Sequence, residues 1–88
     1  MIQTNVKIQN KYGIHARPAT AIVNTASSFD AEVFIEKNGE KVPANSIMSL
    51  LMIAAEYGSE IIIHADGVDE KDVISALVQL FDDKFGED

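Results

Sequence analysis

Cysteine is absent from the 88-residue sequence, and so is tryptophan. The lack of cysteine excludes disulfides and thiolate metal sites, and it agrees with a reducing compartment. The longest apolar run, residues 47–55, is interrupted by Ser49 and is too short to span a bilayer. The opening stretch MIQTNVKIQN lacks the apolar core of a signal peptide. We therefore expect a cytoplasmic protein with no membrane insertion.

Positive charge is scarce as well. Seven lysine and arginine residues face 14 acidic residues, which gives a net charge of −7, and Arg17 is the only arginine. Residues 1–29 contain no acidic residue, and neither do residues 41–55. If these two acid-free segments meet in the fold, they form one neutral-to-positive face on an acidic body. Such a body is a poor partner for nucleic acid, whereas the face suits an anion or an acidic protein.

The length and the apolar content of 47% indicate one domain, residues 1–88, with a single modest core. The alternation in TNVKIQ predicts a strand with Val6 and Ile8 on one side. Pro18, near the start of RPATAIVNTAS, is typical of the first turn of a helix. His15 is therefore predicted at a helix N-terminus, just after a strand-to-helix junction.

The middle of the chain predicts a hairpin followed by a short helix. Asn38-Gly39 between two strand-forming arms is a strong hairpin signal. Pro43 cannot donate to a strand ladder, so the second arm is expected at a sheet edge. Ser46 precedes the apolar run IMSLLMIAA, and a serine in that position favours a helix N-cap.

The last third predicts a strand and a helix. In SEIIIHADG, the alternation of side chains predicts a strand with Ile61, Ile63 and Ala65 on one face. The other face carries Ile62, His64 and Asp66. The final helix is predicted to begin at the cap Asp69 and to end at Gly86. The element order is β-α-β-β-α-β-α, an α+β fold. Burial of all apolar stripes requires the helices to lie on one face of the sheet.

The segment GIHARPAT can be interpreted as a phosphoryl site or as ordinary surface. A helix N-terminus offers free backbone N–H groups to an anion, and the guanidinium of Arg17 suits bidentate phosphate contact. The helix dipole disfavours positive charge on His15, which keeps its imidazole nucleophilic. However, a histidine near a helix start is more often a cap or a solvated residue. Spacing alone favours that second interpretation, with Arg17 as a plain surface charge.

The chain closely resembles HPr, the histidine-containing phosphocarrier family of the bacterial sugar phosphotransferase system. The resemblance is carried by GIHARPAT from Gly13 to Thr20 and continues over the whole chain. Further matching segments are NTAS at 24–27, KNGEKV at 37–42, NSIM at 45–48 and ADGVDE at 65–70. It implies an open-faced β-sandwich, a four-stranded antiparallel sheet with three helices on one face, in agreement with the predicted order.

The resemblance also implies a function. A family member shuttles phosphate from enzyme I, which phosphoenolpyruvate charges, to the IIA domains of sugar permeases. His15 would carry the phosphoryl group on Nδ1, Arg17 would help to stabilise it, and the N–H groups of Ala16 and Arg17 would contact it. The chain would be a stoichiometric carrier rather than an enzyme, with no metal or cofactor, and we expect a monomer.

Two further features follow from the same resemblance. SIM at 46–48 matches the regulatory site of Gram-positive-type members, where an HPr kinase/phosphorylase modifies the serine and the product serves a catabolite-control regulator as co-repressor. The cap interpretation of Ser46 is compatible with that role. The partner interface would include Thr20, Ile47, Met48 and Leu51. Apolar residues at helical spacing are usually core, but a short helix cannot bury all of the run that follows Ser46.

Other functions are weighed against the phosphocarrier. A regulatory binding module that acts mainly through Ser46 would be expected to lack His15. A small metal-free hydrolase would need a second positioned group near His15, and residues 1–29 contain no carboxylate to provide one. His64 is predicted to be a solvated surface residue rather than a metal ligand, because the chain has only two histidines and no cysteine.

Overall fold

The computed structural model describes residues 1–53 and 55–87. Its elements are β1 (Ile2–Lys7), α1 (Ala16–Ser27), β2 (Glu32–Lys37), β3 (Glu40–Pro43), α2 (Ile47–Met52), β4 (Glu60–Asp66), α3 (Glu70–Asp82) and the short 3-10 helix η1 (Lys84–Gly86). All strand pairs are antiparallel, and the sheet order is β1-β4-β2-β3. The predicted element order and the α+β fold class are confirmed.

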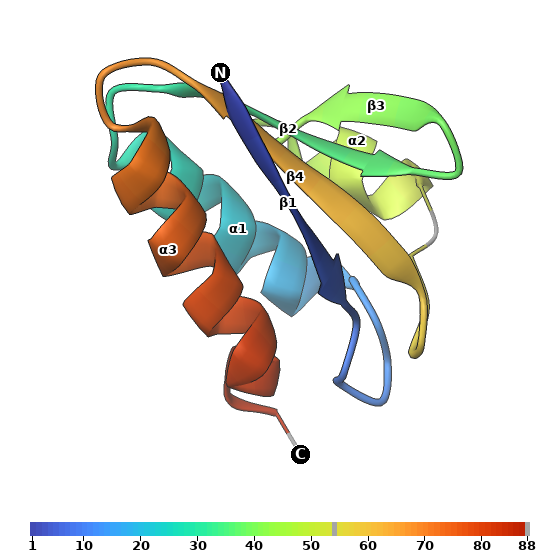
Figure 1. The fold of residues 1–88 in the computed structure, drawn as a ribbon. Coiled ribbons are helices and arrows are strands. Elements are labelled where there is room, and N and C mark those ends of the chain that lie inside the picture. The colour runs from blue at the N-terminus through green and yellow to red at the C-terminus, as the bar shows by residue number, and fades with distance from the viewer. Residues whose placement is uncertain (54, 88) are drawn as a thin grey trace.

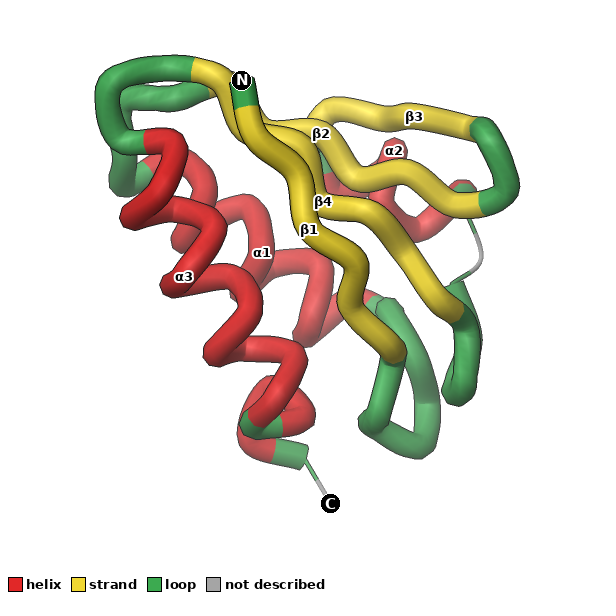
Figure 2. Tube along the Cα trace, viewed as in Figure 1, coloured by secondary structure: helices red, strands yellow, loops and turns green. Residues whose placement is uncertain are grey.

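The helices cover one face of the sheet (Figure 1). Helices α1 and α3 lie side by side and contact each other, and α2 packs against α1 near the β2-β3 edge (Figure 2). The opposite face of the sheet carries no helix in the described part of the chain. No helix within residues 1–53 and 55–87 is long and apolar enough to cross a bilayer.

The core lies between the sheet and the helices. Ile61, Ile63 and Ala65 of β4 are buried on the helix-facing side, as the alternation predicts. Helix α3 contributes buried residues at helical spacing, namely Val73, Leu77 and Phe81. Each large apolar side chain removed from water in this way stabilises the fold by roughly 1.5–3 kcal/mol. Helix α1 adds Pro18, Ala19 and Ile22 to the buried residues and packs against α3, which holds the start of α1 in place.

The hairpin between β2 and β3 forms as predicted. Asn38 and Gly39 have φ angles of 53° and 83°, which is the pair of positive values that a type I′ turn requires. Strand β3 is an edge strand, and it ends at Pro43. An edge position tolerates proline because one side of the strand needs no ladder donor.

Two predictions about α3 are corrected. Asp69 is the residue before the helix, but its carboxylate accepts the backbone N–H of Asp30 at 2.7 Å instead of capping α3. The helix ends at Asp82 and not at Gly86, because the chain turns into η1. Lys84, Phe85 and Gly86 have positive φ angles of 54°, 55° and 76°, which interrupt the helical hydrogen bonds and turn the chain back.

The prediction that His64 is solvated is wrong. Its side chain is 12% exposed, and its Nε2 lies 2.7 Å from Oε1 of Glu36. In the sheet register His64 stands opposite Gln3 on one side and Phe34 on the other, so a strand lies on each side of it. Only the strand order β1-β4-β2 brings these residues together, and the alternation along one strand does not contain that information.

Candidate functional site

The start of α1 is where the histidine of GIHARPAT lies. His15 is the N-cap residue, with an extended backbone (φ −110°, ψ −165°), and its carbonyl accepts the N–H of Ala19 at 2.9 Å. Helix geometry leaves the N–H groups of the first turn without intrahelical acceptors. Pro18 has no N–H, so Ala16 and Arg17 supply the free donors of this turn. The predicted placement of His15 at a helix N-terminus is confirmed.

The loop before His15 is fixed by hydrogen bonds to a distant segment. The buried Asn10 donates from Nδ2 to the carbonyl of Gly13 at 2.7 Å, and Gly13 N–H donates to Asn10 O at 3.1 Å. Ile14 N–H donates to the carbonyl of Ala55 at 2.9 Å. Residues 1–29 therefore meet residues 41–55 beside His15, which fulfils the condition for a shared face of the two acid-free segments.

The carboxylate of Glu87 contacts the ring of His15, and the local sequence around His15 does not predict this contact. Oε2 of Glu87 lies 2.9 Å from Nε2 of His15, and Oε1 lies 3.1 Å from the same nitrogen. Oε1 also accepts from Asn10 Nδ2 at 3.1 Å. Glu87 is 72 positions away in the chain, and the turn at η1 brings it here. Residues 1–29 provide no carboxylate, as the sequence shows, but Glu87 from the other end of the chain brings one to His15.

The Glu87 carboxylate is ionised at neutral pH. Burial alone would raise the pKa of this carboxyl, but hydrogen bonds from His15 and Asn10 and the charges of His15 and Arg17 lower it by more. As a result, the pKa of Glu87 lies below the ordinary value for glutamate. The side chain is only 13% exposed, whereas His15 is 40% exposed. A partly buried anion thus contacts one side of a histidine ring whose remaining surface is open to a partner.

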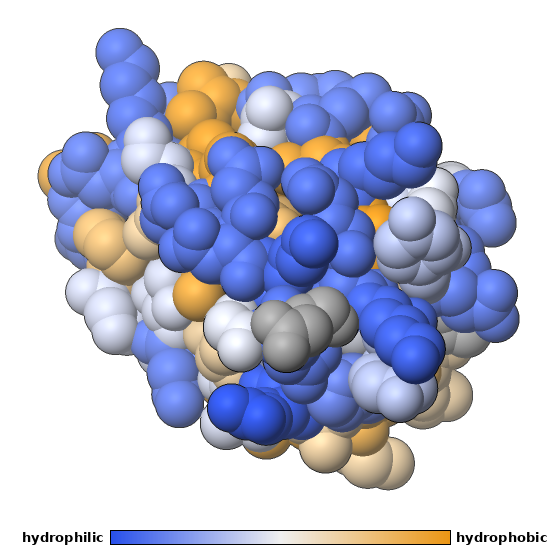
Figure 3. All heavy atoms as spheres, turned by 90° about the horizontal axis from the view of Figure 1, so that it is seen from below, coloured by the Kyte–Doolittle hydropathy of each residue, from blue (hydrophilic) through white to orange (hydrophobic). Residues whose placement is uncertain are grey.

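Basic and aromatic side chains surround a hollow beside this pair. Lys11, Tyr12, Arg17 and Glu87 line it, together with Gly86, and its volume is about 490 Å³. The ring of Tyr12 meets the ring of His15 edge-on with centroids 6.2 Å apart, and the Lys11 ammonium lies 5.5 Å from the Tyr12 centroid. Hydrophilic side chains dominate the middle of this end of the molecule (Figure 3). Two cations beside an open nucleophile can receive an anionic group.

The residues predicted for the partner interface lie on neighbouring elements. Ile47, Met48, Leu51 and Met52 of α2 are exposed, whereas Leu50 faces the core. We call these four exposed residues the α2 apolar patch. Thr20 is exposed on α1, and its hydroxyl donates to the carbonyl of Ala16 at 2.8 Å. Helix α2 packs against α1, so the apolar patch lies on a direct neighbour of the helix that begins after His15.

Ser46 is the N-cap of α2, as predicted. Its Oγ accepts the N–H of Ser49 at 3.2 Å. The side chain is half-buried, and Asn45 before it is exposed. A hydroxyl at this position accepts from one of the free backbone N–H groups of α2. A larger anionic group there would lie at the partially positive N-terminus of the same helix.

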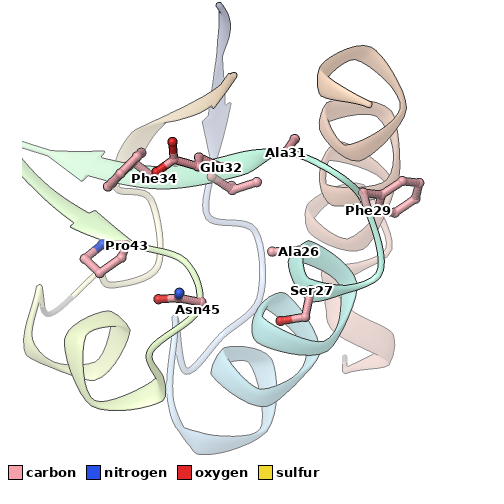
Figure 4. Close-up of a pocket in the computed structure, with 9 residues that line it drawn as sticks. Ala26, Ser27, Phe29, Ala31, Glu32, Phe34, Pro43 and Asn45 are labelled. Carbon is pink, nitrogen blue, oxygen red and sulfur yellow. The ribbon is translucent and has the colours of Figure 1, made fainter. Parts of the chain in front are cut away.

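A separate groove of about 370 Å³ lies at the opposite end of α1 (Figure 4). Its lining includes Ser27, Phe29, Phe34, Pro43 and Asn45. Helix α1 rises about 1.5 Å per residue, which puts this groove roughly 16 Å from His15. Among its described lining residues only Glu32 is charged, so the groove has no cation for a phosphate. It is not part of the His15 site.

Known proteins resemble the chain over its full length. A family model described as "PTS HPr component phosphorylation site" matches residues 2–83. A phosphocarrier protein HPr from Neisseria meningitidis is 41% identical over 87 residues, covering 99% of this chain and 98% of that protein. The crystal structure of HPr-C-His from Thermoanaerobacter tengcongensis has a TM-score of 0.96 at 42% identity, with 100% of this chain and 99% of that chain covered.

A regulatory relative is similar as well. The structure of Crh, the catabolite repression protein of Bacillus subtilis, has a TM-score of 0.76 at 38% identity and covers 96% of this chain and 97% of that chain. That protein was solved as a domain-swapped dimer. The same backbone therefore occurs in proteins named as phosphocarriers and in one named for catabolite repression.

Proposed function

Because the chain belongs to the HPr family of phosphocarriers of the phosphotransferase system, we propose that His15 accepts a phosphoryl group from phosphorylated enzyme I and passes it to the IIA domains of sugar permeases. The observation that carries this proposal is the position of His15 at the N-cap of α1, within a family match that spans residues 2–83. The carrier would work in the cytoplasm as a monomer.

The proposed chemistry uses Nδ1 of His15, as in the family that the chain belongs to, and the free donors at the start of α1. The lone pair of His15 Nδ1 attacks the phosphorus of the donor phosphohistidine, and the donor P–N bond breaks with its electron pair returning to the donor ring. The phosphoryl oxygens then lie near the free N–H groups of Ala16 and Arg17 and near the Arg17 guanidinium. Transfer to a IIA domain repeats the same exchange with His15 as the leaving group.

The proposal is tested by incubating the protein with enzyme I and phosphoenolpyruvate and measuring its intact mass. We expect one added phosphoryl group that is lost in acid and retained in alkali, as a phosphoramidate should be. A known carrier protein, incubated in parallel, shows that the enzyme I is active. If that carrier is phosphorylated and this protein gains no mass, the proposed function is refuted.

Arg17→Lys is expected to slow phosphoryl transfer without affecting the fold. Lysine keeps the charge but loses the planar fork that contacts two phosphoryl oxygens, so we expect a rate lower by roughly 5- to 20-fold. Arg17→Gln, which also loses the charge, should be slower still. Lys71→Gln on the exposed side of α3 serves as the control for loss of charge. Wild-type rates in both Arg17 variants would make the guanidinium a bystander.

The α2 apolar patch is proposed as the docking surface for these partners. Exposed Met48 and Met52 supply flexible apolar contacts beside exposed Ile47 and Leu51, and methionine side chains adapt to more than one partner. Thr20 on α1 extends the surface toward His15. The neighbouring cations Lys11 and Arg17 suit acidic groups around a donor or acceptor histidine.

A second function is favoured by the cap geometry of Ser46. We propose that an HPr kinase/phosphorylase phosphorylates Ser46 and that the product serves a catabolite-control regulator as co-repressor. The supporting observations are the position of Ser46 at a helix start and the similarity to Crh. A phosphate there would meet the N-terminus of α2, which tolerates negative charge.

Ser46→Asp is expected to lower the rate at which enzyme I phosphorylates His15 while leaving thermal stability near wild type. Aspartate still caps the helix, so the fold loses little. Its negative charge, a partial mimic of the about −1.5 to −2 of a phosphate, lies on the side that an anionic donor must approach. We expect a decrease of several-fold to about tenfold at low salt.

Two variants separate position from charge in this test. Ser49→Asp adds the same charge one turn further along α2, and Ser46→Ala removes the cap without adding charge, at a cost of about 1 kcal/mol. If wild type and Ser46→Asp are phosphorylated at equal rates at both low and moderate salt, the coupling between the two sites does not exist.

A further inference from the structure

The Glu87 carboxylate contacts only one of the two ring nitrogens of His15. Both of its oxygens lie within 3.1 Å of Nε2. Its pKa is lowered, so at neutral pH it is an acceptor and cannot donate. Nε2 must therefore carry the proton in this contact. In a neutral imidazole the other nitrogen, Nδ1, then holds the lone pair.

The orientation of Asn10 supports the same assignment. Its amide meets two acceptors, the carbonyl of Gly13 at 2.7 Å and Oε1 of Glu87 at 3.1 Å. Only the NH₂ group can satisfy both, so the amide cannot be reversed without losing both bonds. Asn10 is fully buried, and among the described residues its Oδ1 has no hydrogen-bond partner. Asn10 thus holds the carboxylate of Glu87 in place against Nε2.

Covalent geometry places the two nitrogens differently. Nδ1 is the ring nitrogen nearer the His15 backbone, and His15 is the N-cap of α1. Nδ1, which is bonded to Cγ, is therefore on the backbone side of the ring at the start of α1, whereas Nε2 points toward Glu87. The nitrogen that contacts the carboxylate and the nitrogen on the backbone side are different ones.

We propose that Glu87 is a positioning residue for phosphoryl transfer, which holds the proton on Nε2 of His15 so that Nδ1 presents its lone pair. This inference rests on the proposed function of His15. When Nδ1 attacks a phosphoryl donor, a P–N bond forms, the donor P–N bond breaks and its electron pair leaves with the donor. The His15 ring then carries a proton on Nε2 and a phosphoryl group on Nδ1, and the adjacent carboxylate offsets its positive charge.

The first test measures the tautomer of His15 in the full chain from its ring nitrogen chemical shifts, at a pH where the imidazole is neutral. Wild type should show protonated Nε2 and unprotonated Nδ1. In Glu87→Gln, the oxygen of the new amide is retained by Asn10, so its NH₂ group faces Nε2 as a donor and favours the opposite tautomer. We expect the ratio of Nε2–H to Nδ1–H to fall by ~5-fold or more. Glu87→Ala should give an intermediate ratio.

The second test measures the rate of His15 phosphorylation by phosphoramidate, a small donor that needs no partner protein and releases ammonia. We expect Glu87→Gln to react ~3- to 10-fold more slowly than wild type, with Glu87→Ala between them. Glu40→Gln, at the exposed first residue of β3, removes the same charge far from the site and should react like wild type.

The outcomes separate this inference from the proposed function. Identical tautomer ratios in wild type and Glu87→Gln would overturn the positioning role, and so would a Glu87→Gln rate equal to or above that of wild type. A faster variant would mean that the carboxylate restrains His15. If wild type is not phosphorylated by either phosphoramidate or enzyme I, the proposed function fails, whatever the tautomer.

Discussion

Replacing His15 with alanine is expected to remove all acid-labile phosphate from the protein after incubation with enzyme I and phosphoenolpyruvate. Alanine has no nucleophile, and none of the side chains that line the adjacent hollow, Lys11, Tyr12, Arg17 and Glu87, carries an imidazole that could take over its role. The loss should therefore be complete and not graded. The measurement is intact mass before and after brief acid treatment.

His64→Gln is the matched control, since His64 is the other histidine of the chain. Glutamine can still hydrogen-bond to Glu36 on the open face of the sheet, so the fold should persist and phosphorylation should match wild type. Acid-labile phosphate that remains on His15→Ala, or that disappears in His64→Gln, would move the acceptor to another residue.

The parts of the fold that sequence predicts are those that local chemistry determines. Asn38-Gly39 forms its hairpin because both residues tolerate positive φ angles, and Ser46 caps α2 because its hydroxyl reaches Ser49 N–H within one turn. His15 lies at the N-cap of α1 because Pro18 suits the first turn of a helix. Each of these depends on a few adjacent residues.

The parts that sequence reasoning missed depend on long-range packing. The contact between His64 and Glu36 requires β4 to lie beside β2, which alternation within a strand cannot predict. The contact between His15 and Glu87 requires the turn at Lys84 and Phe85, two residues with positive φ angles that ordinary side chains disfavour. Gly86 indicates in the sequence that the last helix ends nearby, but it does not indicate in which direction the chain continues.

The charge pattern shows the same limit. Residues 1–29 and 41–55 meet where Ile14 N–H donates to the carbonyl of Ala55, which is the condition under which the charge pattern predicts a neutral-to-positive face. The fold then adds one carboxylate from residue 87 to that face, directly on the histidine. A single, partly buried anion next to the His15 ring matters more for the chemistry of that ring than the summed charge of the face, because Coulomb interactions weaken with distance and with solvent screening.

Gly13→Ala is expected to destabilise the protein strongly and to slow His15 phosphorylation. Gly13 has a φ angle of +67°, which costs an alanine about 1–2 kcal/mol. A Cβ at this position would also overlap the carbonyl oxygen of Ala55 and lie 2.9 Å from the Cα of Glu56. Both neighbours are backbone and cannot rotate away, so the loop must move, at a further ~1–3 kcal/mol. Because Ile14 hydrogen-bonds to the same carbonyl, that movement displaces His15.

Gly58→Ala separates the two contributions. Gly58 has a φ angle of +85°, and a Cβ added there meets nothing within 4 Å. Its loss of stability should therefore be limited to the backbone cost of about 1–2 kcal/mol, with phosphorylation by phosphoramidate unchanged. Denaturant unfolding of both variants measures the difference, which we assign to the contact with Ala55. Equal losses of stability would mean that the loop absorbs a methyl group freely. In that case the close approach of Gly13 to Ala55 would not be what holds His15 at the start of α1.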